Sequence, residues 1–347
     1  MDHIGMDLGK RESQVAIITE AGELIEERIR TERLRLQEFF GARPKARILI
    51  EAGTESEWVA RCLEELGHEV IVGDPNYAPM YSQRDRRVKT DRRDALALAE
   101  ACKLGAYHRA HRTSDEKRHM RAVLAVRDAV VRTRTRFIAV VRPLLRREGF
   151  RVRNGNVETF VRRVEELTLP EHLRSEVAPL LALFGPVNEQ IKTLDNQLAT
   201  MVRADEVAKR LTTVPGVGPV TAVSYLSTLD QVERFSSGHK VESYLGLVPA
   251  EWSSSEIEHK GHITKQGNSR TRWLLVEAAW CILGRRKQPA TAPLREWADR
   301  IAARRGSRIA AVALARKLAG ILFAIWRDGT AYDVSKLRSG GTKKKAA

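Results

Sequence analysis

The chain has 347 residues and carries 60 Lys and Arg against 44 Asp and Glu, a formal net charge of +16. This length predicts two or three domains with sizeable buried cores. The cationic excess points to a polyanionic partner, because neutralising phosphates releases counterions and drives binding to nucleic acid.

Targeting and cysteine patterns narrow the class of protein further. An anionic membrane surface could attract the same charge, but no apolar run approaches the roughly 20 residues of a membrane span. Charged residues interrupt the start of the chain, so we expect no signal peptide and no membrane partner. Cys62, Cys102 and Cys281 lie far apart without paired spacing. They predict neither a disulfide framework nor a zinc site and fit a reducing cytoplasm.

The stretch 3–30 predicts two or three strands joined by short turns and paired as antiparallel hairpins. Within it Ile4, Met6 and Leu8 alternate with small or acidic residues, the period of a strand. The run RILIEAG at 47–53 is continuous and apolar, which is typical of a buried parallel strand.

A helix is expected to follow, with Thr54 and Glu57 as a capping box. HEVIVGDP at 68–75 predicts another buried strand, and DRRDALALAEACKLG at 91–105 predicts a helix closed by its glycine. The order of hairpin strands, helix, strand, helix, strand and helix predicts a mixed sheet with helices on its faces. We therefore expect an α/β domain over residues 1–110.

A helical arm is predicted next, over residues 111–205. Apolar residues recur every three or four positions from 113 to 150, which predicts one long helix with a kink at Pro143. A second stretch, 173–209, predicts a returning helix that breaks near Gly185-Pro186. The two together predict an antiparallel arm with the packing of a coiled coil.

The remainder, 206–330, predicts a mainly helical domain. TVPGVGPVTA places Gly216 and Gly218 between prolines, the pattern of a helix-hairpin-helix element whose backbone amides can hold a phosphate. YLGLVPAEWSSSE predicts a loop punctuated by Gly and Pro, and a basic turn then leads into an apolar helix. A last helix, 308–326, precedes a basic tail, 331–347, whose few apolar residues predict disorder.

Four carboxylates occupy positions that suggest chemistry. Asp7 lies in a strand, Glu51 closes the next buried strand, and Asp91 and Asp94 lie at i and i+3 on one helix face. If the two strands are neighbours, all four can converge, and they would repel one another unless a cation neutralised them. Mg²⁺ prefers oxygen ligands and typically takes one or two carboxylates plus substrate phosphates. Two such ions can activate a nucleophile and stabilise the leaving oxygen of a phosphodiester.

The spacing leaves a plainer interpretation open. Asp91 and Asp94 could serve only as ion-pair partners of neighbouring arginines. A nuclease must also hold phosphate beside its metal, so the same cations fit either case. The cations expected to contact phosphate here are Arg87, Lys89, Arg92 and Arg93.

The run EWSSSE offers Ser253, Ser254 and Ser255 as hydroxyl groups. Serine is a weak nucleophile unless a base, a metal or cations assist it, although a cationic pocket can stabilise a phosphorane-like transition state. Serines in a loop are more often plain solvated turn residues, and the sequence alone favours that interpretation. The downstream cations expected to contact nucleic acid are Lys260, Lys265, Arg270 and Arg272.

The whole chain resembles the DEDD-type transposases of bacterial insertion sequences, the bridge-RNA-guided recombinases. IGMDLGKRESQVAII, LIEAGTESEWVARCLEELGHEVIVGDP and KTDRRDALALAEA resemble the family's first strand pair, central segment and acidic helix. LTTVPGVGPVTA, YLGLVPAEWSSSE and GHITKQGNSRTRWLLVEAAW resemble its transposase domain. The order and spacing of the six segments make the resemblance specific.

The resemblance implies a RuvC-like, RNase H-type first domain with Asp7, Glu51, Asp91 and Asp94 as the DEDD carboxylates. Its cofactor would be Mg²⁺ or Mn²⁺. It further implies a coiled-coil arm, a C-terminal transposase domain, and a bacterial cytoplasmic protein associated with the nucleoid.

The resemblance also implies a nucleophilic serine and a covalent phosphoserine intermediate. Laying the family's aromatic-Ser-Ser-Gly run over WSSS puts the nucleophile at Ser254, with Ser255 in place of glycine and Ser253 as the alternative. The implied active site is shared between protomers of a dimer or tetramer. A structured non-coding guide RNA would pair with donor and target DNA, which fits a cationic protein that leaves sequence choice to base pairing.

Three other functions remain open from the residues alone. A junction-resolving nuclease of RuvC type would use the carboxylates and water without serine chemistry. A non-enzymatic scaffold would bind RNA or DNA through its cations. An actin-like phosphotransferase is suggested by GMDLGK, which resembles the first phosphate loop of sugar kinases, but the chain has no second loop of that kind.

Overall fold

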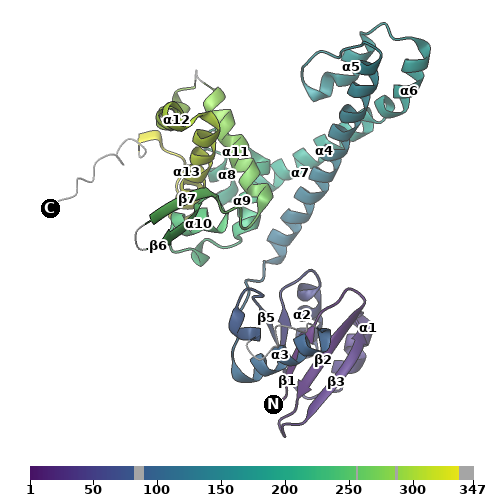
Figure 1. Cartoon of the computed structure of the whole chain (residues 1–347), viewed down its shortest axis with the longest axis vertical. Helices are drawn as coiled ribbons and strands as arrows, with labels where there is room; N and C mark the ends of the chain where they lie inside the picture. Colours follow the sequence, from purple (N-terminus) through teal and green to yellow (C-terminus); the bar gives the residue numbers. More distant parts are fainter. Residues whose placement is uncertain (82–89, 255–256, 286–287, 336–347) are drawn as a thin grey trace, which may run out of the picture. The chain divides into compact units, whose positions relative to one another are not determined.

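The computed structural model describes residues 1–81, 90–254, 257–285 and 288–335. The chain divides into two compact units, Met1–Thr113 and Ser114–Ala347 (Figure 1). The first unit is built on one sheet, whereas the second is helical apart from a two-stranded hairpin.

A five-stranded mixed sheet forms the first unit, in the order β3-β2-β1-β4-β5. Its strands are β1 (His3–Asp7), β2 (Glu12–Ile18), β3 (Leu24–Arg30), β4 (Arg47–Glu51) and β5 (Glu69–Gly73). The first three pair antiparallel, while β4 runs parallel to β1 and β5 runs parallel to β4. The predicted α/β fold and its antiparallel and parallel strands are confirmed.

Three helices cover the two faces of this sheet: α1 (Arg33–Phe40), α2 (Ser56–Glu65) and α3 (Asp91–Leu104). Side chains alternate between the two faces along β1 and β4, so Ile4 and Ile48 pack in the core shared with α1 and α2. Leu49, one residue on, packs instead with Leu98 of α3. Successive strand residues face opposite sides, so α3 alone of these helices covers the second face.

Two details of the first unit differ from the sequence prediction. The capping box predicted at Thr54 and Glu57 is wrong, because α2 has Glu55 as its N-cap, with no side-chain capping bond. Glu57 instead accepts hydrogen bonds from Arg61 and Arg112, at 2.8 and 3.1 Å from its Oε1. The end of α3 is as predicted, since Gly105 has the left-handed conformation with φ of 66°.

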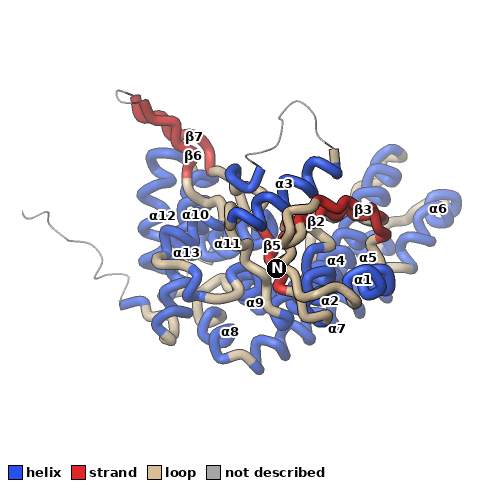
Figure 2. Tube along the Cα trace, turned by 90° about the horizontal axis from the view of Figure 1, so that it is seen from below, coloured by secondary structure: helices blue, strands red, loops and turns tan. Residues whose placement is uncertain are grey.

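A pair of long helices forms the arm of the second unit. Its helices are α4 (Asp115–Arg147), α5 (Phe160–Glu165), α6 (Glu171–Ala182) and α7 (Phe184–Ala204). The views show α4 and α7 side by side, with α5 and α6 at their far end (Figures 1 and 2). The long helix at 113–150 is confirmed, and so is a break in the returning helix near Gly185-Pro186, which lies at Leu183. Gly185-Pro186 lies in the first turn of α7, where a proline removes no helical hydrogen bond.

The rest of the second unit packs around a central helix. Its elements are α8 (Glu206–Leu211), α9 (Pro219–Leu229), α10 (Gly238–Tyr244), β6 (Pro249–Ser254), β7 (Ile257–Ile263), α11 (Ser269–Gly284), α12 (Ala292–Arg305) and α13 (Ser307–Asp328). Short 3₁₀ turns lie at Ala78–Tyr81, Val157–Thr159, Val232–Arg234 and Pro289–Thr291. The sequence patterns predict α11 and α13 but not α5, α10, α12 or the hairpin. The tail from 336 onward lies outside the described residues.

The central helix corrects one expectation about membranes. By length and composition alone, α13 is long and apolar enough to cross a membrane, so the statement that no run approaches a span is wrong. Leu314, Leu318 and Leu322 on this helix are fully buried. They belong to the core that also contains residues of α9, α11 and α12, as expected of the core helix of a globular unit.

Candidate active site

One cavity of the first unit brings the four predicted carboxylates together. It has a volume of about 270 Å³. We call it the acidic pocket, and its lining residues are Asp7, Leu8, Gly9, Glu12, Gln14, Arg28, Glu51, Asp91 and Asp94. Four acidic residues from three distant segments of the chain therefore meet at one place, as the sequence predicted.

Strand register explains how Asp7 and Glu51 come to share the pocket. β1 and β4 are parallel neighbours, with Met6 opposite Ile50. The carboxyl ends of parallel strands meet at one edge of a sheet. Asp7 and Glu51 are the last residues of their strands. Asp7 follows Gly5 by two residues, and Glu51 follows Leu49 by two residues. Gly5 and Leu49 both face α3, so Asp7 and Glu51 also lie on the α3 side of the sheet.

A close approach between α3 and β1 places the other two carboxylates. A Cβ atom on Gly5 would lie 2.1 Å from the carbonyl oxygen of Ala95 and from the amide nitrogen of Ala99. Only glycine allows this contact, which holds α3 against the strand just beyond the first turn of the helix. That turn carries Asp91, which is exposed, and Asp94, which is 6% exposed.

Capping chemistry fixes where α3 begins. Thr90 is the N-cap, and its Oγ1 accepts a hydrogen bond from the amide of Arg93 at 3.3 Å. Acidic residues in a first turn are favoured by the positive end of the helix dipole. Asp91 and Asp94 therefore suit this helix terminus electrostatically while they face the pocket with the strand carboxylates.

The cations around the pocket are partly engaged within the protein. Arg28 of β3 lines the pocket and pairs with Glu12 at 2.8 Å. Arg92 donates from Nε to both carboxylate oxygens of Glu26, at 2.7 and 2.8 Å. This pairing lowers the pKa of Glu26 and ties α3 to β3. Arg93 is exposed.

Two charged residues of the pocket were not predicted from the sequence. Glu12 and Arg28 come from strands β2 and β3. The signal that could have found them is the hairpin register, since Gln14 pairs with Asp7 and Arg28 pairs with Gln14. Arg87 and Lys89 lie outside the described residues.

The serines predicted in a loop belong to a hairpin instead. Ser253 pairs with Glu258 and Ser254 pairs with Ile257 in the register of β6 and β7, which we call the serine hairpin. Figure 2 shows it extending from the helices of the second unit. Ser254 is the last residue of β6, and Ser255 lies outside the described residues. The side chains of Ser253, Ser254 and Lys260 also lie outside the described part.

Comparison with known proteins decides the family. A family model for transposases of the IS116/IS110/IS902 family matches residues 208–294, and a DEDD transposase model for IS110 elements matches residues 4–148. The putative transposase y4pF/y4sB of Sinorhizobium fredii is 30% identical over 336 residues, covering 95% of this chain and 85% of that protein. The chain belongs to the IS110 family of insertion-sequence transposases.

Further relatives cover almost the whole chain. The transposase of insertion sequence IS1328 from Yersinia enterocolitica is 28% identical over 331 residues, 95% of this chain and 98% of that protein. The IS1111A transposase of Coxiella burnetii is 29% identical over 334 residues, with 93% and 88% covered. The family resemblance inferred from the motifs is confirmed. Membership implies an enzyme that cuts DNA.

The acidic pocket of this transposase offers ligands of the type that divalent cations prefer. In the described part of the chain, no three His, Cys, Asp or Glu side chains are grouped so that they could hold one metal ion. The pocket is therefore not a closed protein cage. Mg²⁺ is usually bound by one or two carboxylates with water and phosphate completing its shell, and carboxylate pairs along one cavity fit that mode.

The predicted phosphate-binding turn of the transposase joins α8 to α9. Gly216 has φ of 83°, and a Cβ there would lie 2.7 Å from the carbonyl oxygen of Ala278 in α11. Close packing against α11 thus explains why residue 216 is a glycine. Gly218 is the N-cap of α9, with Pro219 following at the first helical position, where proline is favoured.

Two of the arginines predicted to bind nucleic acid have partners inside the protein. Arg270 pairs with Asp128 of α4 and donates to the carbonyl of Leu124 at 3.0 Å. Arg272 donates to the carbonyls of Leu245 and Gln266, at 2.9 and 2.7 Å. Both therefore join segments of the fold. Lys265 in the adjoining turn is exposed.

Proposed function

We propose that this transposase is guided by RNA and that it cuts and rejoins DNA with metal-bound carboxylates and a serine nucleophile. The observation that carries the proposal is the acidic pocket, where carboxylates from β1, β4 and α3 line one cavity. The mixed sheet with α3 on one face supports a RuvC-like, RNase H-type nuclease domain for the first unit. No comparable group of carboxylates is needed for folding alone, since like charges repel.

The carboxylates have defined roles in this proposal. Asp7, Glu51, Asp91 and Asp94 would hold Mg²⁺ or Mn²⁺, which supplies a Lewis acid for the phosphodiester when bound. The strand carboxylates are fixed by sheet register, and buried Asp94 is fixed by the first turn of α3. Asp91 is exposed and can meet the incoming DNA strand. A cation held there would orient the scissile phosphate and offset its negative charge.

The serine hairpin supplies the nucleophile in this proposal. The Oγ of Ser254 attacks the scissile phosphorus, an Oγ–P bond forms, and the P–O bond to one DNA strand breaks. The serine proton passes to the departing oxygen. Rejoining reverses the exchange, since the hydroxyl of another strand attacks the phosphoserine and restores the serine hydroxyl. Support comes from the family match over 208–294, which includes the hairpin.

The guide RNA is supported by the charge of the chain. A formal net charge of +16 suits binding to phosphate backbones, and base pairing then supplies sequence choice. RNA that copurifies with the protein should contain one dominant structured species encoded beside the gene. A heterogeneous mixture of cellular RNA would contradict this part of the proposal.

A covalent adduct on a denaturing gel tests the serine chemistry. Labelled donor DNA, copurified RNA and Mg²⁺ should yield a protein–DNA adduct with the wild-type protein and with Ser253→Ala, but not with Ser254→Ala. If the adduct instead disappears only with Ser253→Ala, the nucleophile lies one residue earlier. Cleavage that leaves a free 5′-phosphate and no adduct would establish a water-dependent nuclease and reject the serine step.

A further inference from the structure

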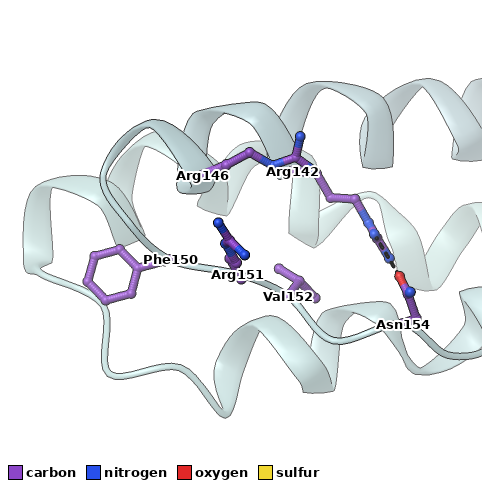
Figure 3. Close-up of a pocket in the computed structure, with 6 residues that line it drawn as sticks. All are labelled: Arg142, Arg146, Phe150, Arg151, Val152 and Asn154. Carbon is purple, nitrogen blue, oxygen red and sulfur yellow. Dashed lines mark hydrogen bonds between the residues drawn. The ribbon is translucent and has the colours of Figure 1, made fainter.

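A second cavity lies at the end of the arm. It has a volume of about 340 Å³ and lies between the last turns of α4 and the segment that follows (Figure 3). We call it the arginine pocket, and its lining residues are Arg142, Arg146, Phe150, Arg151, Val152 and Asn154. None of these residues is acidic, so the cavity concentrates positive charge.

Hydrogen bonds from arginine side chains hold the segment that lines this pocket after α4 in one conformation. Arg163 of α5 is 9% exposed, and its guanidinium donates to the carbonyl oxygens of Arg153 and Asn156. A Cβ on Gly155 would lie 3.1 Å from that guanidinium. Arg142 adds a hydrogen bond from Nη1 to Oδ1 of Asn154 at 3.3 Å, drawn as a dashed line in Figure 3. The pocket walls are therefore held in place by the protein.

An apolar core supports the same end of the arm. Phe160 and Phe184 are buried there and stack with ring centroids 5.3 Å apart. Phe150 and Val152 pack against this core while they line the pocket. The pocket thus has an apolar wall beside its guanidinium groups.

Arginines along the arm differ in how they are partnered. On the shaft, Arg127 pairs with Asp195 of α7 at 2.5 Å, and Arg134 donates to Asn188 at 2.9 Å. At the end, no ion pair joins a pocket arginine to a carboxylate within the described part of the chain. Among the described residues the buried Nε atoms of Arg142 and of Arg134 both lack a hydrogen-bond partner, so the difference between the two groups lies in their carboxylate and amide partners.

We propose that the arginine pocket binds the phosphodiester backbone of nucleic acid. Guanidinium groups match phosphate oxygens in charge and in bidentate geometry. Phe150 and Val152 give a sugar or base an apolar surface, the combination found where proteins bind single strands. The proposal rests on the proposed function for its class of ligand and adds a contact formed by the arm.

Paired variants with equal charge loss test this assignment. Arg146→Gln/Arg151→Gln removes two exposed cations from the pocket, and Arg132→Gln/Arg136→Gln removes two exposed cations from the shaft. Binding is measured with labelled single-stranded RNA and with duplex DNA of mixed sequence, in EDTA over a range of salt. Circular dichroism melting checks that both variants stay folded.

The pocket variant should lose at least about tenfold in affinity for one or both probes. Its slope of log K against log salt should fall by about 1.4 for the single strand or about 1.8 for the duplex, since each phosphate contributes about 0.7 or 0.9. The shaft variant should change the slope by less than half as much. Equal effects of both variants, or an unchanged slope in the pocket variant, would overturn the assignment. Because EDTA stops metal chemistry, this outcome is independent of whether the carboxylates and serine cut DNA.

Discussion

The acidic pocket and the arginine pocket gather like charges of opposite sign. Five carboxylates line the first against one guanidinium, Arg28, which already pairs with Glu12. Three guanidinium groups line the second, with no carboxylate. Elsewhere charges such as Arg127 and Asp195 meet within the protein. Like charges held together repel, so each pocket is stabilised when an opposite charge arrives, a cation in one and a phosphate in the other.

The largest effect is expected from neutralising one carboxylate of the acidic pocket. Asp91→Asn keeps the shape of an exposed side chain but removes a charge and, in the proposed mechanism, a metal ligand. We expect DNA cleavage to fall on the order of 10²–10³-fold or more, as for loss of a group that stabilises transition-state charge. Nucleic-acid binding should be largely kept. A strand-cleavage assay with varied Mg²⁺ measures this.

A matched carboxylate elsewhere provides the control for this prediction. Glu23→Gln removes one exposed charge from the same unit and lies outside the acidic pocket. It should cleave at the wild-type rate. Full cleavage by Asp91→Asn would remove that carboxylate from the mechanism.

Gly5→Ala should disturb the acidic pocket through its scaffold. Its Cβ would lie 2.1 Å from backbone atoms of α3, and such overpacking costs about 1–3 kcal/mol. Cys102 on α3 is fully buried, and burial raises the pKa of its thiol to about 12. A displaced α3 should expose this thiol, so its labelling by a thiol reagent should accelerate.

Gly53→Ala is the matched control for the packing prediction. A Cβ there meets nothing closer than 4.0 Å, so stability and thiol labelling should stay unchanged. Equal labelling rates in the two glycine variants would show that the close approach of α3 and β1 does not hold the pocket together.

Arg270→Gln tests whether Arg270 stabilises the fold, in contrast to the arginines of the arginine pocket, which are proposed to bind phosphate. It would leave Asp128 without its partner at a half-buried place, which we expect to cost about 1–3 kcal/mol. Thermal unfolding measures this loss. The salt dependence of nucleic-acid binding should not change, the reverse of the result expected for Arg146→Gln/Arg151→Gln. If the variant instead reduces the salt dependence of nucleic-acid binding and leaves stability unaltered, Arg270 contacts phosphate, as the sequence predicted.

The smallest effect is expected from Arg92→Gln. The pKa of Glu26 is lowered by Arg92 from its ordinary value of 4.5, so the pair stabilises the fold above that pH and loses its effect as pH falls through the lowered pKa. The difference in stability between wild type and Arg92→Gln should therefore be slight at neutral pH and vanish in acid. A difference that grows in acid would contradict the pairing.

The acidic pocket was predictable because its positions follow from local periodicity. Asp7 and Glu51 end apolar strand runs, and Asp91 and Asp94 repeat at helical spacing, so each carboxylate could be assigned to an element and a face. Parallel pairing of the two neighbouring strands then places their carboxyl ends, and with them Asp7 and Glu51, at one edge of the sheet. The residues from β2 and β3 were missed because their place depends on hairpin register.

The arginine pocket and the serine hairpin depend on tertiary packing. Arg142 and Arg127 look alike on one helix, and only the partner helix shows that Arg127 has a carboxylate opposite it. The strand at Ser253 and Ser254 follows a proline and lacks a clear apolar alternation, so pairing with β7 decides its conformation. Arg270 likewise lies in the first turn of an apolar helix, as a surface cation would, and its contact with Asp128 depends on how α4 and α11 both pack against α9.

Mapping the metal position by iron-dependent backbone cleavage tests the central claim most directly. Fe²⁺ with ascorbate generates hydroxyl radicals that cut the chain close to a bound ion, and mass spectrometry locates the cuts. We expect cuts near Asp7, Glu51 and Asp91, which excess Mg²⁺ and the double variant Asp7→Asn/Asp91→Asn both suppress. Cuts at other segments only, or the same cuts in the double variant, would contradict a metal site in the acidic pocket.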